Sequence, residues 1–220
     1  MENTADSDGS KQITQLTAIN TAKIMTVLLL VSFIGIFGIQ GMRQVIYLCL
    51  QVSYCLWWLL EQWIYPQRRQ QMLNEPVGVG GFIFILLSVG VLYALPGYLA
   101  FTNPEPLSLI AVVVALPLYT FGSLVNAIAD VQKLTAKQYG ADLVTDGIWR
   151  FSRHINYFAD WLRYLSFSIV AGSFWAYLVP AFIALLYSQR IAQKEQSMSQ
   201  KYPDYPAYQQ SSARLIPFIW

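Results

Sequence analysis

Long apolar runs are the feature that most constrains this chain. One run covers Ile24–Ile39, and comparable runs fill 45–65, 77–101 and 107–129. A stretch of about 20 apolar residues matches the hydrocarbon core of a bilayer, where a helix satisfies all of its backbone hydrogen bonds internally. Because 55% of the residues are hydrophobic and only 12% are charged, an ordinary water-soluble domain does not explain the composition. The sequence therefore predicts an all-α, polytopic membrane protein.

We expect about six transmembrane helices. The expected spans are 21–40, 45–65, 77–101, 107–129, 157–170 and 176–187. Several glycines and Pro96 predict close packing and a kink in the third span. Residues 1–20 are polar and lack apolar periodicity, so we expect a mobile tail. With six spans, nearly all loop lysines and arginines fall on one side and Arg43 on the other, so the positive-inside rule places both termini in the cytoplasm.

One polar segment interrupts this pattern and is the strongest candidate for a functional site. Gly147–Tyr164 carries three arginines, the only histidine, an asparagine, an aspartate and several aromatic residues. Placing ionisable groups where a membrane helix begins costs free energy, so such residues are functional candidates by default. If one helix covers the segment, a polar stripe forms along it. The residues of this stripe are Arg153, Asn156, Asp160, Arg163 and Tyr164, with His154, Tyr157 and Trp161 beside them.

The side chains of this segment suit an anionic, nucleotide-like cofactor. Arginines bind phosphates, an amide donates hydrogen bonds and aromatic rings provide stacking surfaces. The competing interpretation is that Asp160 and Arg163 neutralise each other while Arg150 and Arg153 bind lipid phosphates. Thr145-Asp146-Gly147 predicts a capped helix start just before the segment.

Polar residues at other span ends are expected to meet this segment. Asn126 and Asp130 lie one helical turn apart at the end of the fourth span, and Glu61 lies near the end of the second. Glu195 follows the sixth span. In a six-span topology these ends share one membrane face, which predicts a cytoplasmic-facing pocket. The tyrosines of 201–208 either line that pocket or form an interfacial tail.

Several classes of site are not expected. A formal net charge of +2 with scattered cations argues against nucleic acid. His154 is the only histidine, and Cys49 and Cys55 lie inside one predicted span without metal-ligand spacing, so we expect no metal site. Neither a G-x-G-x-x-G motif nor a Walker loop is present, so no soluble nucleotide-binding domain is recognised.

The chain from Asn126 to the C-terminus resembles the catalytic half of the steroid 5-alpha-reductase-like membrane family, including its bacterial branch. More distantly, it is similar to the isoprenylcysteine carboxyl methyltransferases. The resemblance rests on Ala129–Lys133, on Thr145–Phe158 and on Glu195, Tyr202, Tyr205, Tyr208 and Pro217. It implies that Arg153, His154, Asn156 and Tyr157 hold the cofactor, together with Asn126 and Asp130. Arg150, Asp160 and Glu195, from the expected pocket, complete the candidate set.

The resemblance implies that the chain is an oxidoreductase acting on CH–CH groups. Such an enzyme would use NADPH to reduce a carbon–carbon double bond of a lipid. The methyltransferase relatives imply S-adenosylmethionine instead, but they usually show two adjacent glutamates where this chain has Glu195-Gln196. Ile155 stands where the family usually has proline, and Ala159-Asp160 where it often has Gly-Glu. These departures keep a third alternative open, a non-catalytic lipid-binding membrane protein.

We expect the substrate and the cofactor to bind to different parts of the chain. Residues 21–125 would receive a lipid or isoprenoid substrate, and 126–220 would bind the cofactor. Hydride addition to an enone leaves an oxyanion that needs a proton. Tyr54 and Glu61, both on the second predicted span, are the candidate catalytic donors.

Overall fold

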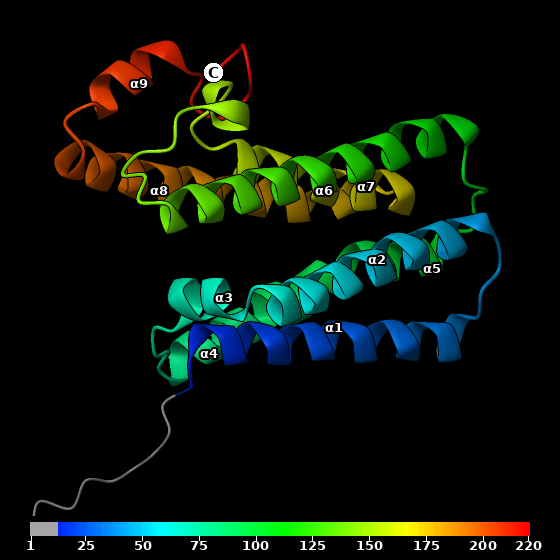
Figure 1. The fold of residues 1–220 in the computed structure, drawn as a ribbon. Coiled ribbons are helices and arrows are strands. Elements are labelled where there is room, and N and C mark those ends of the chain that lie inside the picture. Colours follow the sequence, from blue (N-terminus) through cyan, green and yellow to red (C-terminus); the bar gives the residue numbers. More distant parts are fainter. Residues whose placement is uncertain (1–12) are drawn as a thin grey trace, which may run out of the picture. The chain divides into compact units, whose positions relative to one another are not determined.

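The computed structural model describes residues 13–220, and every regular element in that range is helical (Figure 1). The elements are α1 Gln15–Phe37, α2 Met42–Ile64, α3 Pro66–Leu73, α4 Val79–Ile85, the π-helix η1 Leu86–Val91, the 3-10 helix η2 Leu92–Ala94, α5 Leu95–Thr102, α6 Leu109–Gln138, the 3-10 helix η3 Gly147–Arg150, α7 Ile155–Ala171, the 3-10 helix η4 Phe174–Tyr177, α8 Leu178–Lys201 and α9 Tyr205–Ser211. The all-α prediction is confirmed for this range. Residues 1–12, most of the predicted tail, lie outside the described residues. The remaining part of the predicted tail contains the start of α1.

Four of the expected membrane spans are supported by length and apolar composition. They are Gln15–Phe37, Val79–Thr102, Leu109–Gln138 and Phe174–Lys201. The other two expected spans also form helices, α2 and α7. However, α7 has 17 residues, which extend about 25 Å and fall short of a hydrocarbon core of about 30 Å. Glutamines and Glu61 lower the hydropathy of α2. The structure thus supports four spans where six were predicted.

Two helices continue well beyond their predicted spans. The connection expected from Val131 onward is helical to Gln138, so the loop between α6 and η3 is much shorter. Likewise, α8 continues from its apolar part to Lys201. Lysine, glutamine and glutamate are good helix formers, so a helix does not stop where its apolar stretch stops. The polar ends of α6 and α8 are therefore regular helix beyond the apolar stretches.

The described chain divides into two compact units. One joins the residues up to Ser32 with Cys55–Ala94, and the other joins Phe33–Tyr54 with Leu95–Trp220. In the first unit, the fully buried Ala18 and Ala22 give α1 a small-residue surface. A Cβ on Gly90 would collide with the Met25 side chain, so glycine permits this close approach.

The irregular part of the third span lies at η1 and η2, and η2 ends just before Pro96, one of the residues at which a kink was expected. A π-helical turn leaves backbone carbonyls poorly matched to the neighbouring turns. The Thr26 hydroxyl lies 3.1 Å from the carbonyl oxygens of both Val89 and Gly90. A side chain of α1 therefore satisfies the irregular backbone, which is how a membrane helix tolerates such a turn.

In the second unit, the close packing of α6 on α7 positions the candidate site. A Cβ on Gly122 of α6 would lie 2.5 Å from the Ala159 carbonyl oxygen of α7, so only glycine allows this spacing. Ala159 is fully buried there, and Ile155 is 3% exposed in the same apolar core. Ile155 is the first residue of α7, the position where proline is common. The isoleucine in its place fills the core between α6, η3 and α7.

Polar side chains bind the backbone carbonyl groups at the C-terminal end of α7. Gly172 ends the helix with a φ of 66°, in the left-handed region that glycine adopts without strain. Arg43 Nη1 donates to the Val170 carbonyl at 2.6 Å, and Asn103 Nδ2 donates to the Ala171 carbonyl at 3.1 Å. These donors satisfy carbonyls that a helix end leaves unpaired.

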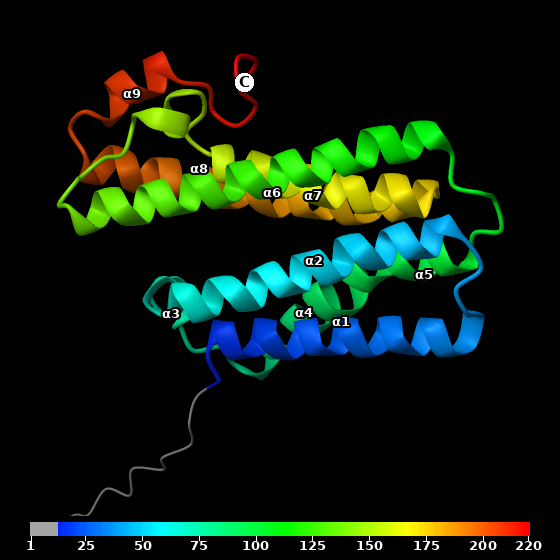
Figure 2. The same ribbon diagram turned by 45° about the vertical axis from the view of Figure 1, so that its right-hand side comes forward.

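The C-terminal segment folds back over the other end of the same helices. Both views show α9 and the residues after it beside the ends of α6 and α8 (Figures 1 and 2). The Arg153 backbone N–H donates to the Ala213 carbonyl at 2.9 Å. Ser152 Oγ, which is buried, donates to the Leu215 carbonyl at 2.9 Å. This return of the chain completes the wall of a cavity.

Candidate functional site

A polar cavity of about 160 Å³ lies in the second unit, where α6, α7, α8 and α9 meet. Its lining residues are Lys133, Lys137, Asp142, Leu143, Val144, Trp149, Arg153, His154, Asn156, Lys194, Ser197, Met198, Tyr205 and Tyr208. Three of the predicted cofactor residues, Arg153, His154 and Asn156, are among them. Tyr205 and Tyr208 also line it, so the structure favours pocket lining over an interfacial tail for these two tyrosines.

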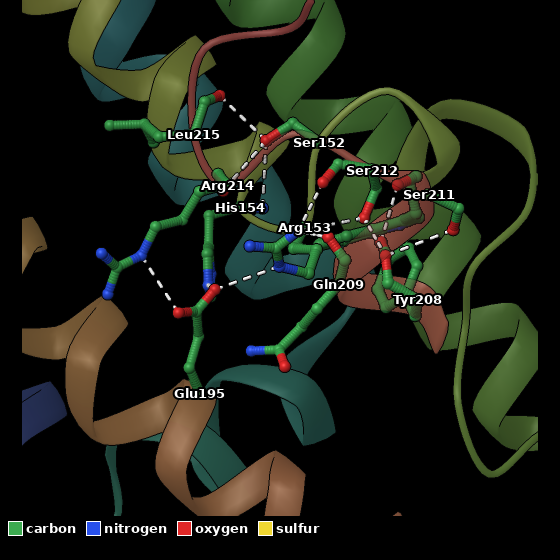
Figure 3. A network of polar contacts seen from close by, with 11 residues as sticks. Ser152, Arg153, His154, Glu195, Tyr208, Gln209, Ser211, Ser212, Arg214 and Leu215 are labelled. Carbon is green, nitrogen blue, oxygen red and sulfur yellow. Dashed lines mark hydrogen bonds and ion pairs between the residues drawn. The ribbon is translucent and has the colours of Figure 1, made fainter. Parts of the chain in front are cut away.

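The predicted single helix through the polar segment is wrong at its start. Gly147–Arg150 forms a separate 3-10 turn, and α7 begins only at Ile155. Asp146 precedes the turn but makes no side-chain capping bond. Arg153 therefore does not extend the polar stripe of α7. It lies with His154 in the bend between the two helices, which turns both side chains toward α8 and α9 (Figure 3).

His154 is buried, uncharged and incompletely satisfied. The residue is 6% exposed, and its Nε2 has no hydrogen-bond partner among the described residues. Burial, followed by the charges of Lys194, Arg153, Lys133 and Arg214, lowers the pKa of His154 from 6.5 to about 3. Its Nε2 also lies 3.6 Å from Glu195 Oε1, but that carboxylate already serves two arginines. The imidazole is thus neutral near pH 7, and a buried polar atom without a partner is what a ligand can satisfy.

Arg153 and Glu195 join the segments that form the cavity wall (Figure 3). Arg153 Nε donates to Glu195 Oε1 at 3.0 Å, and its Nη1 donates to the Gln209 carbonyl at 3.0 Å and to the Ser212 carbonyl. Arg214 pairs with the other oxygen of Glu195 at 3.0 Å. Both predicted cofactor residues therefore hold the bend before α7, α8 and the chain at α9 together.

Lysines supply the positive charge of the cavity, and the sequence analysis missed their role. Lys133, Lys137 and Lys194 line it, against the single lining carboxylate of Asp142. Lys133 Nζ lies 4.9 Å from the Trp149 ring centroid, and Lys194 Nζ lies 4.8 Å from that of Tyr157. One signal was available, because Asn126, Asp130, Lys133 and Lys137 follow helical spacing along one face of α6.

Asn126 and Asp130 of α6 lie beside Asn156 of α7, and all three are predicted cofactor residues. Asn126 Nδ2 donates to the Asn156 carbonyl at 3.0 Å. Asn156 Nδ2 reaches Asp130 Oδ1 at 3.5 Å, the limit of a hydrogen bond. Only Asn156 lines the cavity, so Asn126 and Asp130 act from behind it. Their contacts fix the rotation of α7 against α6 and hence the direction of the Asn156 side chain.

The stacked rings of Tyr157 and Tyr187 connect His154 to the Asp160 carboxylate of α7. The Tyr157 ring stacks on His154 with centroids 5.8 Å apart and on Tyr187 at 4.5 Å. The Tyr187 hydroxyl donates to the Asp160 carboxylate, which also pairs with Arg163. Tyr157 and Asp160, both predicted cofactor residues, thus adjoin the cavity without lining it. Tyr187 was missed because its partner lies on another helix.

The two predicted proton donors belong to different units. Tyr54 lies in the second unit, with its hydroxyl 2.9 Å from that of Tyr164. The Arg163 guanidinium lies 5.2 Å from the Tyr54 ring centroid. Glu61 lies in the first unit, where it is 6% exposed and forms an ion pair with Arg69.

Arg150 lines a different, open groove of about 370 Å³ formed with the C-terminal residues. It does not line the lysine-rich cavity, although the sequence placed it among the cofactor residues. Among residues 13–220, no group of three or more His, Cys, Asp or Glu side chains is arranged to hold a metal ion.

The fold and the cavity define a helical membrane protein with a cationic pocket at one end of its helices. The chain belongs to the family described as "Protein of unknown function (DUF1295)", which matches residues 11–214 and includes steroid 5-alpha-reductase-like membrane proteins. The predicted resemblance to that family is thereby confirmed.

Two curated relatives are distantly similar. The chain is 26% identical over 197 residues to Delta(14)-sterol reductase erg24 of Schizosaccharomyces pombe, covering 78% of this chain and 46% of that protein. It is 24% identical over 183 residues to Delta(14)-sterol reductase of Arabidopsis thaliana, covering 75% and 49%. The chain spans about half the length of these relatives.

Proposed function

We propose that this chain is a membrane reductase that binds NADPH at the lysine-rich cavity and reduces a carbon–carbon double bond of a sterol-like lipid. The substrate class follows from the relatives named Delta(14)-sterol reductase. The proposal retains the predicted six-span topology, with α2 and α7 as additional crossings, because the ends of α6 and α8 then lie on the same side of the membrane; with that topology the positive-inside rule puts the cavity and both termini in the cytoplasm.

The charge of the cavity is the observation that carries this proposal. Arg153 shares the carboxylate of Glu195 with Arg214, and three further cations, all lysines, line the cavity against the one lining carboxylate of Asp142. NADPH is polyanionic, whereas S-adenosylmethionine carries a sulfonium and a net positive charge. Lys133 is half-buried, whereas Lys137 and Lys194 are exposed, and an excess of cations attracts the first molecule and repels the second. The cavity therefore favours the reductase over the methyltransferase alternative.

The residues present fit one polar part of such a cofactor. A volume of about 160 Å³ is below the roughly 300–1,000 Å³ of pockets that enclose a whole ligand. In this proposal Lys133, Lys137 and Lys194 bind phosphates, and His154 Nε2 and Asn156 donate or accept hydrogen bonds. Arg153, Glu195, Asn126 and Asp130 are positioning residues that hold the walls.

When bound, NADPH supplies a hydride, and the protein must deliver a proton to the other carbon of the double bond. Tyr54 is the better supported donor, because its hydroxyl group can donate a proton whereas the Glu61 carboxylate is held in an ion pair with Arg69. The cation of Arg163 beside the Tyr54 ring stabilises the phenolate that remains. The Tyr164 hydroxyl, 2.9 Å away, orients the donor and can return a proton to it.

Ligand-dependent thermal stability tests the cofactor. Titration of the purified full chain with NADPH should raise Tm, since a ligand that binds only the folded state stabilises it. S-adenosylmethionine should not. Lys194→Gln should weaken the NADPH effect, while Arg190→Gln, an exposed arginine one turn earlier on α8, should leave it intact. Stabilisation by S-adenosylmethionine alone would favour the methyltransferase, and stabilisation by neither would favour a non-catalytic lipid-binding protein.

Substrate turnover tests the donor. NADPH consumption with a sterol that carries a Δ14 double bond should fall by about 10²-fold or more in Tyr54→Phe, the range for removal of a general acid. The NADPH-induced rise in Tm should remain. Cys55→Ser, at the neighbouring position on α2, is the matched control. A Tyr54→Phe variant with unchanged turnover would exclude this residue as the donor.

A further inference from the structure

We propose that Tyr187 of α8 and Asp160 of α7 are positioning residues for the proton donor Tyr54. They hold the Arg163 guanidinium beside the Tyr54 ring, so that a side chain of α8 acts on the proton-transfer step. This inference rests on the proposed reductase function and on Tyr54 as its donor. All four residues belong to the second unit. The inference gives Tyr187 a role in the reaction that requires no contact with the cofactor or the lipid.

The Asp160 carboxylate is held at both of its oxygen atoms. Arg163, one turn further along α7, donates from Nη2 to Oδ1. The Tyr187 hydroxyl donates to Oδ2 from α8. Hydrogen bonds to a charged group are stronger than those between neutral groups, and a carboxylate that accepts one at each oxygen cannot rotate freely. The direction in which Asp160 faces Arg163 is therefore fixed by a residue on another helix.

The aliphatic stem of Arg163 is confined as well as its guanidinium. A Cβ on Gly122 of α6 would lie 3.1 Å from Arg163 Cγ, so the missing side chain of this glycine leaves the room that the stem occupies. Arg163 is 6% exposed. A free arginine side chain populates many rotamers, whereas this one is held at its stem by α6 and at its head by Asp160. The guanidinium is thereby kept 5.2 Å from the Tyr54 ring centroid.

The guanidinium is not fully satisfied by its partner. Arg163 Nε is buried and has no hydrogen-bond partner among the described residues, and such groups are retained where they serve function. Because Tyr187 donates to Asp160 at Oδ2, part of the negative charge of the carboxylate is drawn away from Arg163. A charge acts more strongly in a buried place than in water. The Arg163 cation therefore acts on Tyr54 in addition to balancing Asp160.

This arrangement favours the step in which Tyr54 gives up its proton. The Tyr54 O–H bond breaks, a C–H bond forms on the lipid and a phenolate remains, while NADPH supplies the hydride for the other carbon. A cation fixed in advance beside the ring stabilises that phenolate. The phenolate then regains a proton from water through the Tyr164 hydroxyl, which lies 2.9 Å away. Without the Tyr187 hydroxyl the Asp160 carboxylate compensates Arg163 more fully, and this stabilisation decreases.

Tyr187→Phe tests this role, because it removes the hydroxyl and keeps the ring that stacks on Tyr157 at 4.5 Å. In the purified full chain, kcat for a sterol with a Δ14 double bond should fall about tenfold, the effect of one hydrogen bond to a charged group. KM for the sterol and the NADPH-induced rise in Tm should not change. The solvent deuterium isotope effect on kcat should rise, because proton transfer becomes slower. Tyr177→Phe, 40% exposed in η4, is the matched control and should behave as the wild type.

A double variant separates positioning from packing. If Tyr187 acts through Tyr54, then Tyr187→Phe should cause no further loss of kcat when it is added to Tyr54→Phe, because the two changes remove the same interaction. Losses that multiply in the double variant would overturn the inference. So would an unchanged kcat and isotope effect in Tyr187→Phe alone.

A measurement without substrate distinguishes this inference from the proposed function. When 3-fluorotyrosine replaces Tyr54, the fluorine resonance reports the charge beside the ring. It should shift in Tyr187→Phe and stay in place in Tyr177→Phe. An unmoved resonance in a chain that binds NADPH and reduces the sterol would overturn the inference and leave the reductase function standing. A wild-type chain that neither binds NADPH nor reduces a sterol would overturn the proposed function and this inference with it.

Discussion

The two ends of α7 both bury a cationic or titratable side chain, but they satisfy it differently. At the end near Gly172, Arg43 donates to the carbonyl oxygens of Val170, Glu105 and Pro106. At the start, His154 Nε2 lacks a partner among the described residues and is surrounded by lysines and arginines. A buried group that is fully hydrogen-bonded stabilises a fold, whereas unsatisfied atoms and like charges are retained for binding or catalysis. The comparison indicates a structural role for the end of α7 near Gly172 and favours the start of α7 as the candidate site.

Removal of Arg43 should have the largest effect on stability. Arg43→Met leaves the carbonyls of Val170, Glu105 and Pro106 without their donor in a buried place, which should cost about 3 kcal/mol or more in the free energy of unfolding. Denaturation of the purified variant measures the loss. NADPH affinity of the molecules that remain folded should be unchanged. A variant as stable as the wild type would contradict the structural role of this end.

Acid should destabilise the protein through His154. Because the folded-state pKa of about 3 lies below the ordinary value of 6.5, only the unfolded chain takes up the proton as pH falls below about 6.5. The stability is therefore fully present above that pH and is lost as pH falls toward 3. The loss should reach about 2 kcal/mol by about pH 5.

His154→Gln gives the control for this pH dependence. The chain has one histidine, so the variant should flatten the stability profile between about pH 7 and 5, before most carboxylates titrate. A slope that persists in His154→Gln would show that another group is responsible and that His154 is not held neutral.

The lysines should affect binding more than folding. Lys194→Gln should weaken NADPH binding about tenfold, which corresponds to about 1.4 kcal/mol, because one charge-assisted contact is lost. The stability without ligand should stay the same or rise, since repulsion from the remaining cations decreases. Isothermal titration and denaturation separate the two quantities, and a large loss of stability would reassign Lys194 to a structural role.

Ile155→Pro should have the smallest effect. Proline suits the first position of a helix, but the exchange removes apolar side-chain atoms from a site that is 3% exposed. The two effects oppose each other, and we expect a net loss of about 1 kcal/mol or less. Denaturation with Ile155→Val as the control for lost packing measures the difference. A gain in stability would show that the helix start outweighs the core contact.

The membrane frame could be predicted because it depends on local pattern. Apolar runs located α1, α6 and α8, and the polar residues of 147–164 indicated the candidate site before any fold was known. The prediction failed where a helix end depends on distant contacts. The bend before Ile155 is held by the C-terminal segment, through the Arg153 N–H bond to the Ala213 carbonyl, and no local propensity indicates that contact.

The sequence alone determined that this protein is helical, membrane-embedded and polar at the start of α7, because hydropathy and residue type act within single segments. Only the tertiary structure decided which groups meet. It directed Arg153 to Glu195, brought Lys194 of α8 over Tyr157 and placed Arg150 in a separate groove. These pairings depend on how each helix is rotated and how far it extends relative to its neighbours. That information lies in the packing of whole segments, such as Gly122 against Ala159, rather than in the spacing of residues along any one of them.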